Sequence, residues 1–464
     1  TILPNDVATI IYTSGTTGDP KGVMLSHRNI ISNFTAHAEA QPLNHNHRIV
    51  SFLPLCHIYE RSMNYEYQYL GVSIYYAESL ATIAADILEV KAHGFCAVPR
   101  ILEMIYDKLI AAGKDLSGIK KVIYFLSIHH GHRYDLHKGF WYKFWQKLFD
   151  KLVYAKWREK FGGNRMAIVC GSSAVRDKIV RLFHAAGLEI FEGYGLSETS
   201  PVISVNSATT NQVKIGTVGP ILKGVEVKLA DDGEILTKGP SLMLGYYKDP
   251  EYTKQVIDSD GWFHTGDIGI FVDNKYLKIT DRKKEIFKLS AGKYIAPQMI
   301  ENKLKESPLI TDVMVIGENE KFASAIISPN FNYLHFWAGK HKIHYRDNTQ
   351  LISHPETVKR VQKEIDSLSK NLAPYEQIKC FRLVEDEWSP QTGELSPTLK
   401  LKRNVLTKKY QSIIDQIYNK PTQSGGHGFS LKQINLSLIN LKSSIDSAIK
   451  KSGDSQKSGN TNID

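Results

Sequence analysis

Apolar runs and segments of helical spacing alternate along the first part of the chain. Continuous apolar runs at 49–53, 71–77 and 94–98 predict buried strands, and the spacing over 27–40 and 83–90 predicts helices. Parallel strands need a crossover between them, which is usually a helix, so this alternation is typical of a doubly wound parallel sheet. The pattern therefore predicts an α/β domain.

The pattern changes further along the chain. Short strand-like runs at 225–229, 233–238 and 261–269 are separated by turns, which predicts a small β-rich subdomain. After these runs, a helix at 298–306 and two strands within 313–327 predict a compact α+β unit. The second half is therefore expected to fold differently from the first.

The last part of the chain has its own composition. Beyond residue 419, Ser, Asn, Gln, Gly and Lys prevail, which is typical of a flexible linker. Spaced Leu and Ile residues predict one amphipathic helix at 431–449, and residues 450–464 are expected to be disordered. No catalytic role is expected for this tail.

A loop of Ser, Thr and Gly follows the strand-like run at 7–12 and precedes Lys21. Glycine and hydroxyl side chains allow several donors to face one anion, and the lysine adds a positive charge. Because Lys21 follows Pro20 and leads into a second apolar run, this is not the Walker loop, and a hairpin without a ligand is the alternative. The loop consists of Thr13, Ser14, Gly15, Thr16, Thr17 and Gly18.

The complete run from 12 to 23, Tyr-Thr-Ser-Gly-Thr-Thr-Gly-x-Pro-Lys-Gly-Val, resembles the signature loop of the adenylate-forming enzymes. These are the acyl-CoA synthetases, the luciferases and the adenylation domains of peptide synthetases. Further motifs follow in the family's order: Leu-Pro-Leu-x-His-x-x-Glu-Arg at 53–61, Gly-Tyr-Gly-Leu-Ser-Glu-Thr at 193–199, Trp-Phe-His-Thr-Gly-Asp at 262–267 and Pro-Thr-Leu-Lys-Leu-Lys-Arg at 397–403. The resemblance implies an α/β fold with a large N-terminal domain of doubly wound sheets, a small β-rich subdomain and a mobile α+β C-terminal lid.

The resemblance also implies roles for single residues. Lys400 is the implied catalytic lysine, with Lys402 as its rival, and His57 is expected beside the carboxylate and the nucleotide. Thr13 and Glu198 are the implied magnesium ligands, since both offer the hard oxygen atoms that Mg²⁺ prefers.

The remaining implied residues bind the nucleotide and coenzyme A. Asp267 is expected to accept both ribose hydroxyls, with Arg282 nearby, while Lys284 is the hinge pivot and Gly292 leaves room for the pantetheine arm. Tyr194 can stack on a purine. The other implied nucleotide-binding residues are Thr13, Ser14, Gly15, Thr16, Thr17, Gly18, Lys21, Gly171, Ser172, Ser173, Gly193, Gly195 and Ser197.

The resemblance divides the chain into an adenylation domain at 1–280 whose start is missing, a hinge at 281–286, a lid at 287–418 and the flexible tail at 419–464. It implies that ATP activates a fatty acid to acyl-AMP and that coenzyme A then takes up the acyl group, releasing AMP. ATP, Mg²⁺ and coenzyme A are the implied cofactors and substrates. A fatty acyl-AMP ligase, or another carboxylate-adenylating enzyme, is the alternative.

A basic aromatic segment at 120–165 narrows the resemblance to the long-chain fatty acyl-CoA synthetases, which carry a similar helical insertion. It holds eleven Lys or Arg against three Asp or Glu, and it supplies most of the formal net charge of +10. Such a helix suits an anionic membrane surface, but a helix with a core-facing aromatic side and solvated lysines explains the same pattern. No nucleic-acid-binding signature accompanies it, so nucleic acid is not an expected partner.

Four scattered cysteines, Cys56, Cys96, Cys170 and Cys380, show no paired spacing and favour reduced thiols in a cytoplasm. No apolar run approaches the roughly 20 residues that span a bilayer. The expected location is therefore cytoplasmic, with the insertion as the one candidate for peripheral contact at the inner membrane surface. The sequence makes no prediction of the oligomeric state.

Overall fold

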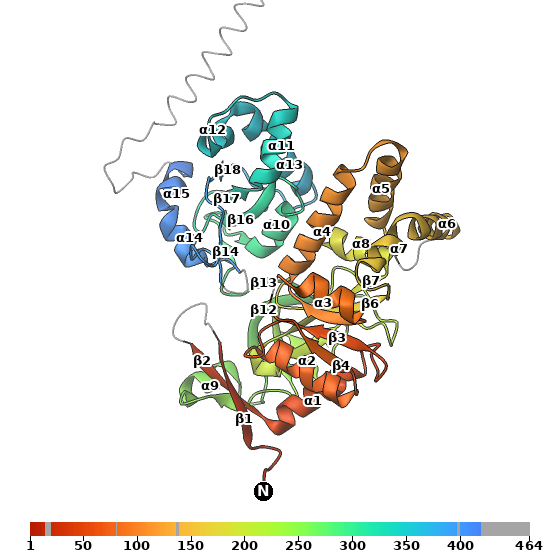
Figure 1. Ribbon diagram of the computed structural model, residues 1–464. Helices are drawn as coiled ribbons and strands as arrows, with labels where there is room; N and C mark the ends of the chain where they lie inside the picture. The colour runs from red at the N-terminus through yellow and green to blue at the C-terminus, as the bar shows by residue number, and fades with distance from the viewer. Residues whose placement is uncertain (14–19, 80, 136–138, 397–399, 419–464) are drawn as a thin grey trace, which may run out of the picture.

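A computed structural model describes residues 1–13, 20–79, 81–135, 139–396 and 400–418 (Figure 1). The chain opens with an antiparallel sheet in the order β1-β2-β11, in which Thr13 lies opposite Lys21. β1 and β2 therefore flank the Ser/Thr/Gly loop. The bounds are β1 (Val7–Thr13), β2 (Lys21–Ser26) and β11 (Gly245–Tyr246).

The doubly wound sheet predicted from the first half is present. Six strands lie in the order β4-β3-β5-β6-β7-β8; the first five run parallel and β8 pairs antiparallel with β7. The strands are β3 (Arg48–Ser51), β4 (Ser73–Tyr76), β5 (Gly94–Ala97), β6 (Met166–Cys170), β7 (Leu188–Gly195) and β8 (Val202–Val205).

Both faces of this sheet are covered. Phe95 and Ile168 face one buried cluster, whereas the next residue on each strand, Cys96 and Val169, faces another. This alternation follows from the period of two in a strand, and burial on both faces explains the continuous apolar runs. The helices of this part are α1 (His27–Ala38), α2 (Ile58–Tyr69), α3 (Ile83–Val90), α4 (Pro99–Lys114) and α8 (Asp177–Ala186).

The predicted insertion is helical and projects from the sheet (Figure 1). Its second half packs into the core through Phe149, Tyr154 and Trp157, which are buried, whereas Phe140 and Trp141 at the start of α6 are exposed. The aromatic residues of the segment are therefore core-facing in its second half and exposed at the start of α6, and contact with a membrane surface stays a prediction. Its elements are α5 (Gly118–Gly131), α6 (Phe140–Phe149), the π-helix η1 (Asp150–Tyr154) and α7 (Ala155–Glu159).

The β-rich subdomain is an antiparallel sheet in the order β13-β12-β10-β9. In its register Asp267 on β12 faces Arg282 on β13, which brings two of the singled-out residues together. The elements are η2 (Ser197–Thr199), β9 (Glu226–Leu229), β10 (Glu234–Lys238), α9 (Pro250–Val256), β12 (Phe263–Val272) and β13 (Tyr276–Arg282).

The last described part is the expected α+β unit. It has a buried cluster of its own, whose members run from Leu289 to Phe381, around the sheet β16-β17-β18. The tail at 419–464, with the helix expected at 431–449, lies outside the described residues. The strands are β14 (Phe287–Lys288), β15 (Tyr294–Ile295), β16 (Ile310–Ile316), β17 (Ser324–Pro329) and β18 (Cys380–Leu383). The helices are α10 (Pro297–Leu304), α11 (Phe331–Lys340), α12 (Asn348–Ser353), α13 (Pro355–Ser369), α14 (Arg403–Lys409) and α15 (Gln411–Ile417).

Candidate active site

The β1–β2 hairpin holds the two described ends of the Ser/Thr/Gly loop. Thr13 Oγ1 donates to the carbonyl of Lys21 across the hairpin at 3.5 Å. Ser14, Gly15, Thr16, Thr17 and Gly18 lie outside the described residues. The loop is thus bounded by a hydroxyl on one strand and an ammonium group on the other.

Lys21 is held by aromatic rings and one carboxylate. Its Nζ lies 2.8 Å from the ring centroid of Tyr252, 5.7 Å from that of Tyr246 and 3.9 Å from Asp249 Oδ2. The face of an aromatic ring attracts a cation, which fixes the direction of an otherwise flexible side chain. The sequence analysis missed Tyr246 and Tyr252, because nothing near them in the sequence indicates that β11 pairs with β2.

Glu198 lies in η2, on the loop after β7. Its Oε1 accepts a hydrogen bond from Tyr246 Oη at 2.8 Å, and its backbone carbonyl accepts one from Met243 N at 2.8 Å. Burial raises the pKa of the Glu198 carboxyl, and the Tyr246 hydrogen bond opposes that rise. A cation beside such a carboxylate stabilises its charged form and so compensates for the hydration that the carboxylate has lost.

The candidate adenine site lies where β6 and β7 end. These neighbouring strands run parallel, so Gly171 to Ser173, which follow β6, and Gly193 to Gly195, which end β7, lie at the same edge of the sheet, where α/β proteins bind ligands. Ser172 has φ 82°, a conformation that non-glycine residues rarely adopt. A Cβ on Gly195 would lie 1.8 Å from the carbonyl oxygen of Pro201, so the turn before Ser197 requires glycine.

Asp267 is the centre of a polar triad. Tyr194 Oη donates to its Oδ2 at 2.8 Å, and Arg282 Nε lies 3.0 Å from its Oδ1. Burial raises the pKa of Asp267, and the charge of Arg282 opposes this. Each carboxylate oxygen keeps a second acceptor site, as a pair of ribose hydroxyls would need.

Lys400, from the C-terminal unit, lies within electrostatic reach of the same triad. Its charge favours the ionised Asp267 and so opposes the rise in the pKa of Asp267 that burial causes. Although Lys400 is exposed, desolvation and next the charge of Arg282 lower its pKa to about 8. Lys402 precedes α14, and its backbone N–H donates to the carbonyl of Glu394.

His57 and Gly292 lie apart from these contacts. His57 occupies the N-cap of α2, is exposed, and makes no capping hydrogen bond with its side chain. Gly292 lies in the β14–β15 turn with φ 83°, and a Cβ there would meet only Lys288 Cε at 3.8 Å. Neither residue is joined to the triad by a hydrogen bond among the described residues.

The predicted hinge has a fixed residue on each side of Lys284. Lys283 Nζ forms ion pairs of 2.7 Å with both Asp232 and Glu234 of the β-rich subdomain. Glu285 Oε2 accepts from Arg403 Nε at 2.8 Å and from Gln298 Nε2 at 2.9 Å, both in the C-terminal unit. Lys284 itself is exposed between these two contacts, while Asp281 ahead of it already accepts a hydrogen bond from Gln298 N of α10 at 3.1 Å.

A second contact joins the two parts beside the candidate adenine site. Arg176 Nη1 donates to the carbonyl of Lys305 at 3.0 Å, and Lys178 donates to the carbonyl of Glu306. Both acceptors follow the last turn of α10, where helix carbonyls lack partners and attract cations. In Figure 1, α10 lies next to α4 and the start of α8.

Two family models match the chain. Residues 1–247 match the AMP-binding enzymes, and residues 284–422 match the C-terminal domain of AMP-binding enzymes. The chain is 35% identical over 434 residues to the peroxisomal long chain acyl-CoA synthetase 7 of Arabidopsis thaliana, covering 89% of this chain and 61% of the relative. It is 32% identical to a long-chain-fatty-acid–CoA ligase of Mycobacterium bovis, covering 89% of this chain and 70% of the relative.

Solved structures share the fold. The adenylation domain of a carboxylate reductase from Mycobacterium chelonae superposes with a TM-score of 0.67 at 23% identity, covering 90% of this chain and 61% of that one. An O-succinylbenzoate coenzyme A synthetase from Bacillus subtilis, in complex with ATP and a magnesium ion, gives a TM-score of 0.61 at 20% identity, covering 88% and 71%. At these identities the likeness establishes the α/β fold of two unequal domains.

Proposed function

Because the chain belongs to the family of AMP-binding enzymes, we propose that it is a long-chain fatty acid–CoA ligase. ATP would activate a fatty acid to acyl-AMP with release of pyrophosphate, and the thiol of coenzyme A would then attack the acyl carbonyl and release AMP. The chain spans 61% of the Arabidopsis relative, so this activity is proposed for the whole protein.

The observation that carries the proposal is the Asp267 carboxylate held by Tyr194 and Arg282, with Lys400 of the C-terminal unit within electrostatic reach of it. An enzyme that forms an adenylate must hold the ribose and stabilise charge at the α-phosphate at the same time. The Asp267 carboxylate offers acceptors for ribose, and Lys400 brings a positive charge from the other domain. Lys400 fits this role better than Lys402, because the charge of Lys400 reaches the triad.

The same reading assigns the two domains successive tasks. We propose an adenylation domain at 1–280, a hinge at 281–286 and a lid at 287–418, with Lys284 as pivot between the fixed residues Lys283 and Glu285. Lys400 must be near the phosphates in the first step, whereas the second step needs a path for the pantetheine arm past Gly292. His57 stays a proposed substrate-site residue at the start of α2.

The chain's residues fit a magnesium ion held largely by ATP. The described residues contain no group of three or more His, Cys, Asp or Glu that could hold a metal by themselves. Mg²⁺ at nucleotide sites commonly takes one or two protein oxygens, with phosphates and waters as its other ligands, and the half-buried Glu198 carboxylate with the Thr13 hydroxyl suits this set. When bound, the ion would offset phosphate charge.

Replacement of Glu198 by alanine is expected to lower pyrophosphate release by roughly 10²-fold at fixed Mg²⁺, because a carboxylate that offsets metal charge is lost. The measurement is fatty-acid-dependent pyrophosphate release across a Mg²⁺ titration. Glu251→Ala is the control, because that carboxylate is exposed on α9 and its one ion pair within the described part of the chain is with Lys254. A Glu198→Ala protein with the wild-type rate would remove Glu198 from the metal site.

The test of the function is a coupled assay of the full-length protein. Acetate, octanoate and palmitate are offered separately with ATP and coenzyme A, and acyl-CoA and AMP are measured. We expect the highest turnover with palmitate. Acyl-AMP without thioester would assign the protein to the acyl-AMP ligases, and no turnover with any acid would overturn the proposal.

We also propose that α6 contacts an anionic membrane surface at the inner face of the membrane. Phe140 and Trp141 are 77% and 74% exposed, and Phe144 and Trp145 on the same helix are also exposed. Lysines lie among them, and aromatic and basic groups together suit an interface that is apolar beneath charged headgroups. Among the described helices, none is both long enough and apolar enough to cross a bilayer.

The double substitution Phe140→Ser and Trp141→Ser is therefore expected to reduce binding to phosphatidylserine vesicles several-fold in a flotation assay. The control is Phe336→Ser, because Phe336 is an exposed aromatic residue on α11, in the other domain. Equal binding by the double variant and the wild type would exclude this helix as the contact surface.

A further inference from the structure

The helix α1 follows directly after β2, the strand that begins with Lys21. It carries two buried asparagines one turn apart. Asn29 and Asn33 are 6% and 1% exposed. Positions four apart lie on the same face of a helix, so both side chains project toward the same side. Each contacts a different distant segment of the chain.

Asn33 holds the loop that carries Glu198. Its Oδ1 accepts from Val202 N at 3.1 Å, and its Nδ2 donates to the carbonyls of Thr199 and Val202 at 3.2 and 2.8 Å. A buried amide is suited to this because it donates and accepts at once. The backbone on the C-terminal side of Glu198 is therefore tied to α1.

Asn29 holds the segment that leads to Tyr246. Its Nδ2 donates to the carbonyls of Pro240 and Leu242 at 2.7 and 2.8 Å, while its Oδ1 accepts from Ser26 N at 2.9 Å. The amide thus joins the end of β2 to the approach to β11. Tyr246 follows four residues after Leu242, and its ring also lies near Lys21.

The two held segments meet each other at the candidate metal ligand. Tyr246 Oη donates to Glu198 Oε1, Met243 N donates to the carbonyl of Glu198, and Ser200 Oγ donates to the carbonyl of Ser241, each at 2.8 Å. The positions of Glu198 and Tyr246 are therefore set by two backbone segments, one held by Asn33 and the other by Asn29, both on α1.

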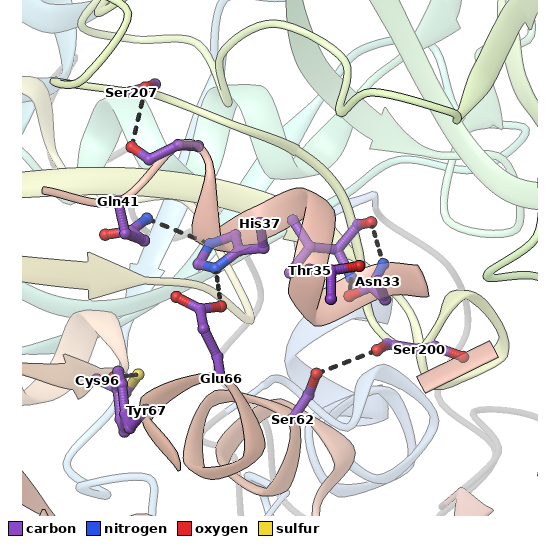
Figure 2. Close-up of polar contacts among 12 residues, drawn as sticks. Asn33, Thr35, His37, Gln41, Ser62, Glu66, Tyr67, Cys96, Ser200 and Ser207 are labelled. Carbon is purple, nitrogen blue, oxygen red and sulfur yellow. Dashed lines mark hydrogen bonds and ion pairs between the residues drawn. The ribbon is translucent and has the colours of Figure 1, made fainter. Parts of the chain in front are cut away.

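α1 is in turn fixed to α2 behind these contacts. His37 Nδ1 and Glu66 Oε2 lie 2.5 Å apart with both side chains fully buried, and Gln41 Nε2 contacts the other ring nitrogen at 3.2 Å (Figure 2). Ser62 on α2 also donates to the carbonyl of Ser200 at 3.3 Å. Buried polar groups that hydrogen-bond to one another favour a single arrangement of the elements that carry them, although Gln41 Oε1 and Glu66 Oε1 have no partner among the described residues.

We propose that Asn29 and Asn33 are positioning residues that set Glu198 and Tyr246 in register with the phosphate-binding hairpin. The inference rests on the proposed function in one respect, the assignment of Glu198 to the metal. β2 and α1 form one continuous connection, with Lys21 at the start of β2 and the Glu198 loop bound to α1. Loss of either amide should shift the position of the Glu198 carboxylate. The Glu198 side chain itself is unchanged by the substitution, and the rest of the fold should be kept.

The test compares Asn33→Ala, Asn33→Asp and Asn29→Ala with the wild type in the full-length protein. The control is Thr35→Ala, because among the described residues Thr35 Oγ1 donates only to the carbonyls of Ile31 and Ser32, within the same helix. Mn²⁺ binding is titrated by electron paramagnetic resonance with the α,β-methylene analogue of ATP. Hydrogen–deuterium exchange of residues 196–206 is followed separately, without nucleotide.

We expect about tenfold weaker Mn²⁺ binding and faster exchange of 196–206 for the Asn33 and Asn29 variants, and wild-type values for Thr35→Ala. Asn33→Asp should fail as Asn33→Ala does, because it keeps the volume but loses both donated hydrogen bonds. Unchanged exchange, or unchanged Mn²⁺ binding in variants whose Tm has fallen, would overturn the positioning role.

The exchange measurement separates this inference from the proposed function. A wild type that fails to bind Mn²⁺ and the analogue would refute the metal assignment, whereas faster exchange of the Glu198 loop in the asparagine variants would still support its fixation by α1. A wild type that binds both, with no change of exchange in the variants, would refute the inference and leave the proposed function standing.

Discussion

Replacement of Lys400 by alanine is expected to lower acyl-adenylate formation by about 10²–10³-fold, while thioester formation from supplied acyl-adenylate stays near the wild-type rate. The reason is that the ammonium group is needed only while negative charge develops at the α-phosphate. The two half-reactions are measured separately, by pyrophosphate release and by acyl-CoA formation from synthetic acyl-adenylate.

Lys402→Ala is the matched control for this prediction. It removes a lysine two residues away, at the N-cap of α14, without touching the charge that acts on Asp267. Equal loss of both half-reactions in Lys400→Ala would remove the proposed role. If Lys402→Ala alone separated the two steps, the catalytic lysine would be Lys402.

The pH profile gives a second test of Lys400. The lowered pKa, about 8 in the free protein, means that the charged form is complete well below that pH and is lost as the pH rises through it. Because kcat/KM reports ionisations of the free enzyme, kcat/KM for ATP should fall above about pH 8. Lys400→Arg should remove this fall, since a guanidinium stays charged.

Lys284→Pro is expected to leave substantial acyl-adenylate formation and to lower thioester formation by orders of magnitude. Proline fixes φ near −65°, so the lid can occupy one orientation at most, whereas the two steps need two. The substitution should not break the fold, because no backbone hydrogen bond from Lys284 N is present among the described residues and its φ is not positive.

Lys284→Ala is the control, because it removes the same side chain and leaves the backbone free to rotate. Single-turnover formation of acyl-adenylate and of acyl-CoA is followed for both variants. If the proline variant slows both steps by one factor while its circular dichroism stays native, the pivot lies at another residue. A lost circular dichroism signal would mean that this position does not tolerate proline, against the backbone argument.

The fold could be predicted well where one element carries its own pattern. The strand expected at 94–98 is β5 at Gly94–Ala97, and the helix expected at 27–40 is α1 at His27–Ala38. The burial of these elements shows in the period of their hydrophobic residues, so this period and the length of each run are enough to predict them. The strand expected at 71–77 is shorter, at Ser73–Tyr76, because Gly71 with φ 70° still belongs to the turn after α2.

The candidate site could be predicted only in part. Motifs identified Asp267 and Arg282, and the antiparallel register of β12 and β13 puts them opposite each other. Tyr246, Asn29 and Asn33 were missed, because their contacts join segments up to 213 residues apart, and no local period encodes such pairing. The exposed start of α6 could not be told from its buried continuation, since both have aromatic residues at helical spacing.

The contact of Arg176 and Lys178 with the end of α10 has a thermodynamic consequence. Arg176 follows Ser173 by three residues, so the segment that would enclose an adenine also carries the cations that contact the C-terminal unit, the proposed lid, in the orientation seen here. If a bound nucleotide strengthens that hold by some factor, linkage requires that the held lid raise nucleotide affinity by the same factor. Release of AMP and release of the lid would then be two expressions of one coupling free energy, and a weaker cation pair would shorten the residence time of AMP.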